Sequence, residues 1–142
     1  MDKQIKYRAG YKYQLAENYV IDLNIKIDVP IDTEYINLTT SGILTIKEGY
    51  AWDGASGPTW DDKSNMRGSL VHDALYQLLR EKRLPLNYRQ VADDILFQLC
   101  KEDGMSTFRA TIWRTMVGSF AGGAALPQND KEILTAPNCI YD

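Results

Sequence analysis

Histidine and cysteine are scarce in this sequence. Its 142 residues include a single histidine, His72, and two cysteines, Cys100 and Cys139. Zinc sites join several histidines and cysteines at short spacings, so one histidine with two distant cysteines argues against zinc. Two thiols cannot form a disulfide framework, and a reducing compartment is the simpler prediction.

A strong charge of one sign and a long apolar run are missing as well. The net charge of −3 gives no electrostatic reason to expect nucleic-acid binding. The most apolar stretch, residues 110–126, contains Arg114 and three glycines, so it falls short of a membrane span. The first residues lack the apolar core of a signal peptide, and we expect no secretion by that route.

The composition is typical of a soluble globular protein, with 44% apolar and 25% charged residues. The length fits one domain over residues 1–142. Residues 1–50 contain short alternating runs rich in tyrosine and β-branched residues, the pattern of strands. The sequence predicts an α+β fold. It has a small N-terminal antiparallel sheet of three to five strands with a turn at Ser41-Gly42, and then a glycine-rich loop over residues 51–64.

Residues 65–125 carry apolar side chains at helical spacing and predict three helices. The first follows Ser64 as its N-cap and ends near Glu81. The second starts near Asn87, where Gln90 completes a variant of the capping box.

Gly104 is well placed to end the second helix. The third is expected to start after Ser106 or Thr107. Its apolar stripe consists of Phe108, Ile112, Trp113, Met116, Val117 and Phe120. Residues 126–142 are polar and are interpreted as a coil tail.

His72 and Asp93 are the candidate catalytic residues. Each lies at the edge of an apolar helix face, and the short connection predicts that the first two helices are antiparallel neighbours. A carboxylate on one ring nitrogen of a histidine fixes its tautomer and makes the other nitrogen a better base. The alternative is a half-buried structural histidine that is satisfied by a neighbouring acid.

Asp53 and Asp73 are the candidate metal ligands. Ca²⁺ and Mg²⁺ prefer carboxylates and loop carbonyls, and a glycine such as Gly54 lets a loop turn its carbonyls inward. If the chain holds a cofactor, we expect Ca²⁺ or Mg²⁺. The alternative is that Asp53 caps its own turn and that Asp73 is solvated.

Four residues are predicted to contact a ligand: Gly54, Ser56, Tyr76 and Arg114. The loop does not carry the nucleophile pattern G-x-S-x-G, because Pro58 stands in place of the last glycine. Hydrogen bonding of Ser56 within its own turn is the favoured interpretation. Tyr76 lies where an aromatic side chain either walls a pocket or belongs to the core.

Three motifs follow one another along the chain. They are GYAWDGASGP at residues 49–58, HDALY at residues 72–76 and AD at residues 92–93. Over roughly residues 40–125 the chain resembles a domain-of-unknown-function family of phages and prophages, number thirteen fifty-three. That family shows T-D-x-x-S-x-P, then H-D-x-L-Y, then A-D, and ends with an arginine-containing helix and a glycine pair.

Arg114 and Gly122-Gly123 occupy the last positions of that pattern here, and Trp52 stands where the family usually has threonine. The resemblance implies a phage protein, located in the cytoplasm of the bacterial host or in the virion. Its partner would be a host or phage protein or a small-molecule ligand. The resemblance implies no settled activity.

The His72-Asp73-x-x-Tyr76 pattern is also similar to the helix pair of the secreted phospholipase A2 enzymes. That similarity implies that His72 is the base, Asp73 a calcium ligand and Asp93 the residue that orients the histidine. The flanking cysteines of that family are missing, and Leu75 stands in one of their places.

Two functional classes therefore stay open. The first is a small hydrolase that acts on an ester, amide or phosphoester. The second is a non-catalytic phage protein, either a virion component or a binder of a host factor or small signalling molecule. The hydrolase predicts an open cleft at His72 with one ring nitrogen free. The non-catalytic protein predicts a closed His72 with both ring nitrogens paired, and an exposed apolar patch elsewhere.

Overall fold

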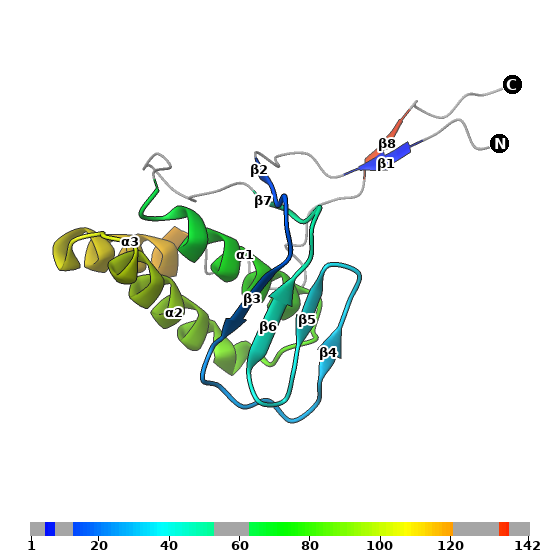
Figure 1. The fold of residues 1–142 in the computed structure, drawn as a ribbon, viewed down its shortest axis with the longest axis horizontal. Helices are drawn as coiled ribbons and strands as arrows, with labels where there is room; N and C mark the ends of the chain where they lie inside the picture. The colour runs from blue at the N-terminus through cyan, green and yellow to red at the C-terminus, as the bar shows by residue number, and fades with distance from the viewer. Residues whose placement is uncertain (1–4, 8–12, 53–62, 121–133, 137–142) are drawn as a thin grey trace, which may run out of the picture.

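The structure is a computed structural model that describes residues 5–7, 13–52, 63–120 and 134–136 (Figure 1). Antiparallel strands occupy the N-terminal half and three α-helices follow, so the predicted α+β fold is confirmed. In the described part of the chain, no helix is long and apolar enough to cross a membrane.

The main sheet has four strands in the order β3-β6-β5-β4, within the predicted range of three to five. The strands are β3 (Tyr19–Asp22), β4 (Ile31–Asp32), β5 (Ile36–Leu38) and β6 (Ile43–Ile46). Ile36 pairs with Ile46 and Leu38 with Leu44, and all four side chains are fully buried. The residues between them face away from the core, because side chains alternate across a strand.

The predicted turn at Ser41-Gly42 is confirmed. Gly42 has φ +95°, a conformation that side-chain-bearing residues rarely adopt. A Cβ atom there would lie 2.3 Å from the backbone oxygen of Ile25. Glycine is therefore required both by the backbone conformation and by the close approach of the neighbouring segment.

Three α-helices and a short 3-10 helix form the second layer. They are α1 (Met66–Arg80), the 3-10 helix η1 (Leu86–Tyr88), α2 (Arg89–Glu102) and α3 (Thr107–Phe120). The N-cap of α1 is Asn65 rather than Ser64. The capping box predicted at Asn87 is wrong, because η1 leads directly into α2 and the N-cap of α2 makes no side-chain hydrogen bond. Gly104, with φ +101°, ends α2 as predicted.

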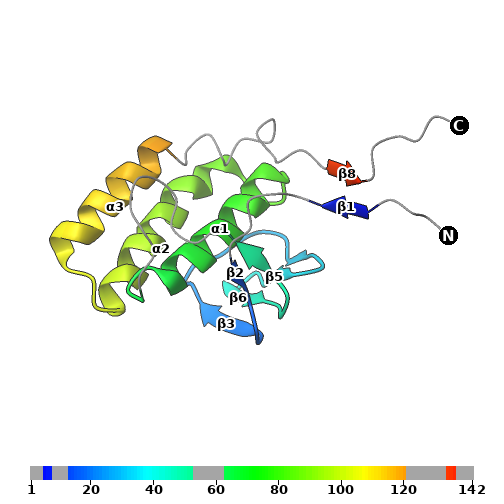
Figure 2. The same ribbon diagram turned by 90° about the horizontal axis from the view of Figure 1, so that it is seen from above.

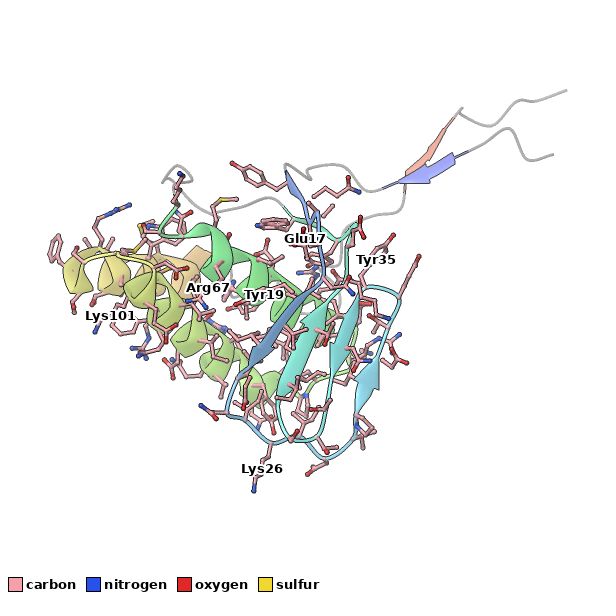
Figure 3. The ribbon with its side chains drawn as sticks, in the orientation of Figure 1. Glu17, Tyr19, Lys26, Tyr35, Arg67 and Lys101 are labelled. Atoms are coloured by element: carbon pink, nitrogen blue, oxygen red, sulfur yellow. The ribbon has the colours of Figure 1, made fainter. Side chains whose placement is uncertain are left out.

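The sheet lies against the pair α1 and α2, and α3 lies beyond α2 (Figures 1 and 2). Arg67 of α1 donates hydrogen bonds to the hydroxyl of Tyr19 on β3 and to Asp103 after α2 (Figure 3). This guanidinium group ties the first strand of the main sheet to both helices.

Gly68 sets the separation of α1 and α2. A Cβ atom there would lie 3.0 Å from the sulfur of Cys100 and from a methyl group of Leu96. Such contacts are tighter than ordinary packing, so the two helices approach as closely as a missing side chain allows. His72 lies one helical turn further along the same face of α1.

The orientation of α3 differs from the prediction. Phe108 is 76% and Ile112 40% exposed, whereas Ala110 and Trp113 are buried. The helix thus packs through a neighbouring face and leaves one edge of its apolar stripe in solvent. The side chains of Val117 and Phe120 lie outside the described set.

Two short strand pairs lie outside the main sheet, and neither pairing was predicted. Strand β1 (Ile5–Tyr7) pairs with β8 (Leu134–Ala136), so the coil predicted for residues 126–142 is wrong at these three positions. Strand β2 (Tyr13–Gln14) pairs with β7 (Ala51–Trp52), which replaces the first residues of the predicted loop. Strands β1 and β2 fall within the N-terminal region predicted to be β, whereas β7 and β8 are too short to be recognised by periodicity.

Candidate functional site

The predicted meeting of His72 and Asp93 occurs across the interface between α1 and α2. His72 and Tyr76 are four residues apart on α1, so their side chains share one face of that helix. The antiparallel helix α2 presents Asp93 to both of them. We call His72, Tyr76 and Asp93 the polar cluster.

One carboxylate oxygen connects the polar cluster. Nε2 of His72 lies 2.8 Å from Oδ1 of Asp93, and the hydroxyl of Tyr76 donates to the same oxygen at 2.7 Å. The two rings are 4.0 Å apart between centroids. His72 and Asp93 are each 4% exposed and Tyr76 is 2% exposed. The three side chains are therefore almost entirely buried. The burial of His72 agrees with the prediction for the non-catalytic class, and a hydrogen bond joins Nε2, one of its two ring nitrogens, to the cluster.

His72 and Asp93 have the geometry of a buried ion pair, and their surroundings favour the charged forms of both groups. Burial opposes the charged imidazolium, but the carboxylates of Asp73 and Asp93 outweigh it and raise the pKa of His72 above its usual value. Oδ1 of Asp73 lies 3.9 Å from Nδ1, an ion-pair distance rather than a hydrogen bond. Burial likewise opposes the charged form of Asp93, but His72 and Tyr76 outweigh it and lower the pKa of Asp93.

The hydroxyl of Tyr76 is held protonated. Burial and the neighbouring Asp93 carboxylate raise the pKa of Tyr76 well above its usual value, and Arg89 opposes them in part. Tyr76 was predicted to contact a ligand, but its hydroxyl is buried and donates to Asp93. Its position in the structure is that of a core residue.

Of the two predicted metal ligands, Asp53 and Asp73, the structure describes only Asp73. Asp73 lies beside His72, while Asp53 falls outside the described residues together with Gly54 and Ser56. Within the described ranges, no three histidine, cysteine, aspartate or glutamate side chains converge to hold a metal ion. The Ca²⁺ or Mg²⁺ site stays a prediction that depends on the loop at residues 53–62.

Asp93 also borders a surface hollow between α2 and α3. We call it the α2–α3 hollow; it has a volume of about 260 Å³. Its lining residues are Arg89, Gln90, Asp93, Thr111, Arg114 and Thr115. Arg114, one of the predicted ligand-binding residues, therefore shares this hollow with the predicted catalytic Asp93. The buried cluster reaches the surface through one carboxylate.

Two residues in or beside this hollow, Arg89 and Asp94, were given no role by the sequence prediction. Arg89 precedes Asp93 by one helical turn and interacts with both Tyr76 and Asp93. That spacing alone places Arg89 on the same face of α2, so the signal was present. Asp94 pairs with Arg114 across the two helices. This contact depends on how α3 packs, which no local spacing reveals.

A larger hollow lies elsewhere on the molecule. Its volume is about 870 Å³, and it lies between the main sheet and the end of α1, where Tyr35, Lys47, Gln77 and Glu81 are among its lining residues. The polar cluster and Arg114 do not line it. Size alone therefore does not favour the predicted site.

No protein-family model, curated protein or solved structure matches this chain. The resemblance to the phage family consequently rests on the order and spacing of its motifs, and it stays a prediction. The geometry of the residues themselves has to carry any functional argument.

Proposed function

We propose that this chain is a phage-encoded, non-catalytic binding protein whose polar cluster locks α1 to α2. The observation that carries the proposal is the burial of His72, whose Nε2 is engaged by Asp93. A general base needs a free lone pair within reach of its substrate. His72 is buried, with Asp93 on Nε2 and the Asp73 carboxylate 3.9 Å from Nδ1, so neither ring nitrogen is open to a substrate.

The phage origin of the proposal comes from the three ordered motifs. Two of these motifs supply the polar cluster itself, because HDALY contributes His72 and Tyr76, and AD contributes Asp93. The family pattern at these positions is thus explained by helix–helix locking without a reaction. Binding of a host factor or small molecule then falls to other surfaces.

Exposed apolar side chains on α3 favour binding over an isolated structural role. Phe108 and Ile112 lie one helical turn apart and are both exposed. Large apolar side chains exposed together often mark an interaction surface. The non-catalytic class predicted such a patch away from His72.

A hydrolysis screen with a matched variant tests the proposal. The chain is incubated with model esters, amides and phosphoesters, with and without Ca²⁺ or Mg²⁺, beside His72→Gln and the control Asp94→Asn. We expect no turnover above buffer from any of them, and reduced stability only for His72→Gln. Turnover that His72→Gln abolishes while its melting temperature stays unchanged contradicts the proposal.

A further inference from the structure

The α2–α3 hollow has the size and polarity of a site for one small group. Its volume of about 260 Å³ lies below the roughly 300–1,000 Å³ of pockets that hold drug-sized ligands. Two of its lining side chains, Arg89 and Arg114, are cationic, and one, Asp93, is anionic. The remaining three, Gln90, Thr111 and Thr115, are neutral and polar.

Beside this hollow, the exposed carboxylate of Asp94 already interacts with donor groups from both α2 and α3. Nε2 of Gln90 donates to Oδ1 of Asp94 at 3.2 Å, and Nη2 of Arg114 lies 2.5 Å from the same oxygen. The Asp94 side chain is 51% exposed, so its ion pair is screened by water and stabilises the fold little. Asp94 therefore acts as an internal anion that an external one can displace.

The two guanidinium groups are held in place before any ligand arrives. Arg114 lies over the ring of Phe97, with 5.6 Å between the guanidinium carbon and the ring centroid. Arg89 interacts with Tyr76 and Asp93 of the polar cluster. Planar guanidinium groups match the oxygens of phosphate and carboxylate groups, and their prior orientation lowers the entropic cost of binding.

Asp93 is the one carboxylate that lines the hollow, and its negative charge is countered by His72. Asp93 lies 2.8 Å from the ring of His72, on the buried side of α2. Oδ1 of Asp93 is engaged by His72 and by the hydroxyl of Tyr76, and the raised pKa of His72 favours a charge that offsets the carboxylate, so the two arginines dominate the electrostatic character of the hollow. The polar cluster thus helps to make an anion site at the surface.

From these contacts we propose that the α2–α3 hollow binds a single phosphate group, with Arg114, Gln90 and Arg89 as its donors and Asp94 displaced. The phosphate is either free or carried by a small organic molecule. Thr111 and Thr115 donate their hydroxyl protons one turn back along α3, and these hydroxyls can rotate toward a bound oxygen. The inference deepens the proposed function, because it names the class of ligand that a non-catalytic binder takes.

Two phosphate probes and three variants test the site. The full chain is titrated with inorganic phosphate and separately with phenyl phosphate at pH 7 and constant ionic strength. Binding is followed through backbone amide signals and the ring signals of His72. The variants are Arg114→Gln, Asp94→Asn and the control Arg83→Gln, whose arginine is similarly exposed but lies outside the hollow.

We expect saturable binding that shifts the His72 ring signals, because Asp93 contacts both the ring and the hollow. Arg114→Gln should weaken binding about tenfold, the loss expected for one charged hydrogen bond. Asp94→Asn should tighten binding several-fold by removing the competing carboxylate, and Arg83→Gln should change nothing. Equal affinity for the two probes indicates free phosphate as the ligand, and tighter binding of phenyl phosphate indicates an organic phosphate.

Absence of saturable binding, or equal effects of Arg114→Gln and Arg83→Gln, overturns the phosphate site. Either result leaves the non-catalytic function intact. Release of phosphate from phenyl phosphate that requires His72 has the opposite meaning. It contradicts the non-catalytic function and leaves the anion site standing.

Discussion

Asp93 and Asp94 are consecutive residues of α2 in contrasting surroundings. Asp93 faces α1, is 4% exposed and accepts hydrogen bonds from His72 and Tyr76. Asp94 faces α3, has a half-exposed side chain and pairs with Arg114. The α1–α2 interface is closed around Asp93, which also lines the α2–α3 hollow, whereas Asp94 lies beside that hollow through its contact with Arg114. One aspartate is thus part of the fold, and its neighbour is the carboxylate that we propose a ligand displaces.

The largest expected difference between the two acids is in stability. Asp93→Asn leaves the buried imidazolium of His72 without its ionised partner, which should cost about 3 kcal/mol of unfolding free energy. Urea denaturation of the wild type, Asp93→Asn and Asp94→Asn measures the difference. Similar losses for the two variants would show that Asp93 is no more embedded than Asp94.

The close approach of α1 and α2 can be broken without touching a charge. Gly68→Ala places a methyl group 3.0 Å from Cys100 and Leu96, and such overpacking should cost about 1–3 kcal/mol. Alanine is the better helix former by about 1 kcal/mol, so a net loss isolates the clash. Thr115→Ala, at an exposed position of α3, serves as the control. A Gly68→Ala protein more stable than wild type contradicts the close packing.

The pH dependence of stability sharpens the comparison further. The raised pKa of His72 means that its contribution is complete below the unfolded value of about 6.5. That contribution is lost as the pH rises through the folded value, at no more than about 1.4 kcal/mol per pH unit. Urea midpoints between pH 6 and 9 should fall for wild type and Asp94→Asn. In His72→Gln, the part of this decrease in urea midpoint that comes from His72 should be missing. If the variant keeps the full decrease, another titrating group causes it.

At acidic pH, the pH dependence of stability is expected to reflect the titration of Asp93. Its lowered pKa contributes stability above the unfolded value of about 3.8, which is lost as the pH falls through the folded value. The polar cluster therefore contributes most between about pH 4 and 6.5. Stability that rises continuously from pH 4 to pH 9 is incompatible with a buried imidazolium–carboxylate pair.

The smallest expected effect is that of the exposed pair. Asp94→Asn and Arg114→Gln should each change the unfolding free energy by about 0.5 kcal/mol or less, and their coupling should stay below about 1 kcal/mol. A double-mutant cycle in urea gives this coupling. A coupling of several kcal/mol would mean that the Asp94–Arg114 pair is structural and is not displaced by a ligand.

Local sequence signals predicted the elements on which the site depends. Apolar periodicity identified the three helices, and the edge positions of His72 and Asp93 predicted their meeting. The helical periodicity that placed His72 at the edge of an apolar face underestimated how deeply this side chain is buried. A helical wheel counts neighbours within one helix, whereas Gly68 brings a second helix close enough to cover the edge.

Features that depend on long-range packing were not predictable. The exposure of Phe108 and the contact of Asp94 with Arg114 follow from the rotation of α3, which its apolar stripe alone does not determine. Strand β8 pairs with residues at the other end of the chain. Arg89 was predictable, because its four-residue spacing from Asp93 places both side chains on one face of α2, but no role was assigned to it.

The ionisation of His72 tests the central claim most directly. The chain has one histidine, so its ring signals in an NMR titration need no assignment. We predict that the ring stays charged to a pH above 6.5 and that Ca²⁺ or Mg²⁺ leaves the titration unchanged. A pKa at or below 6.5, or one that moves when either metal is added, would contradict the buried ion pair and return His72 to the role of a base.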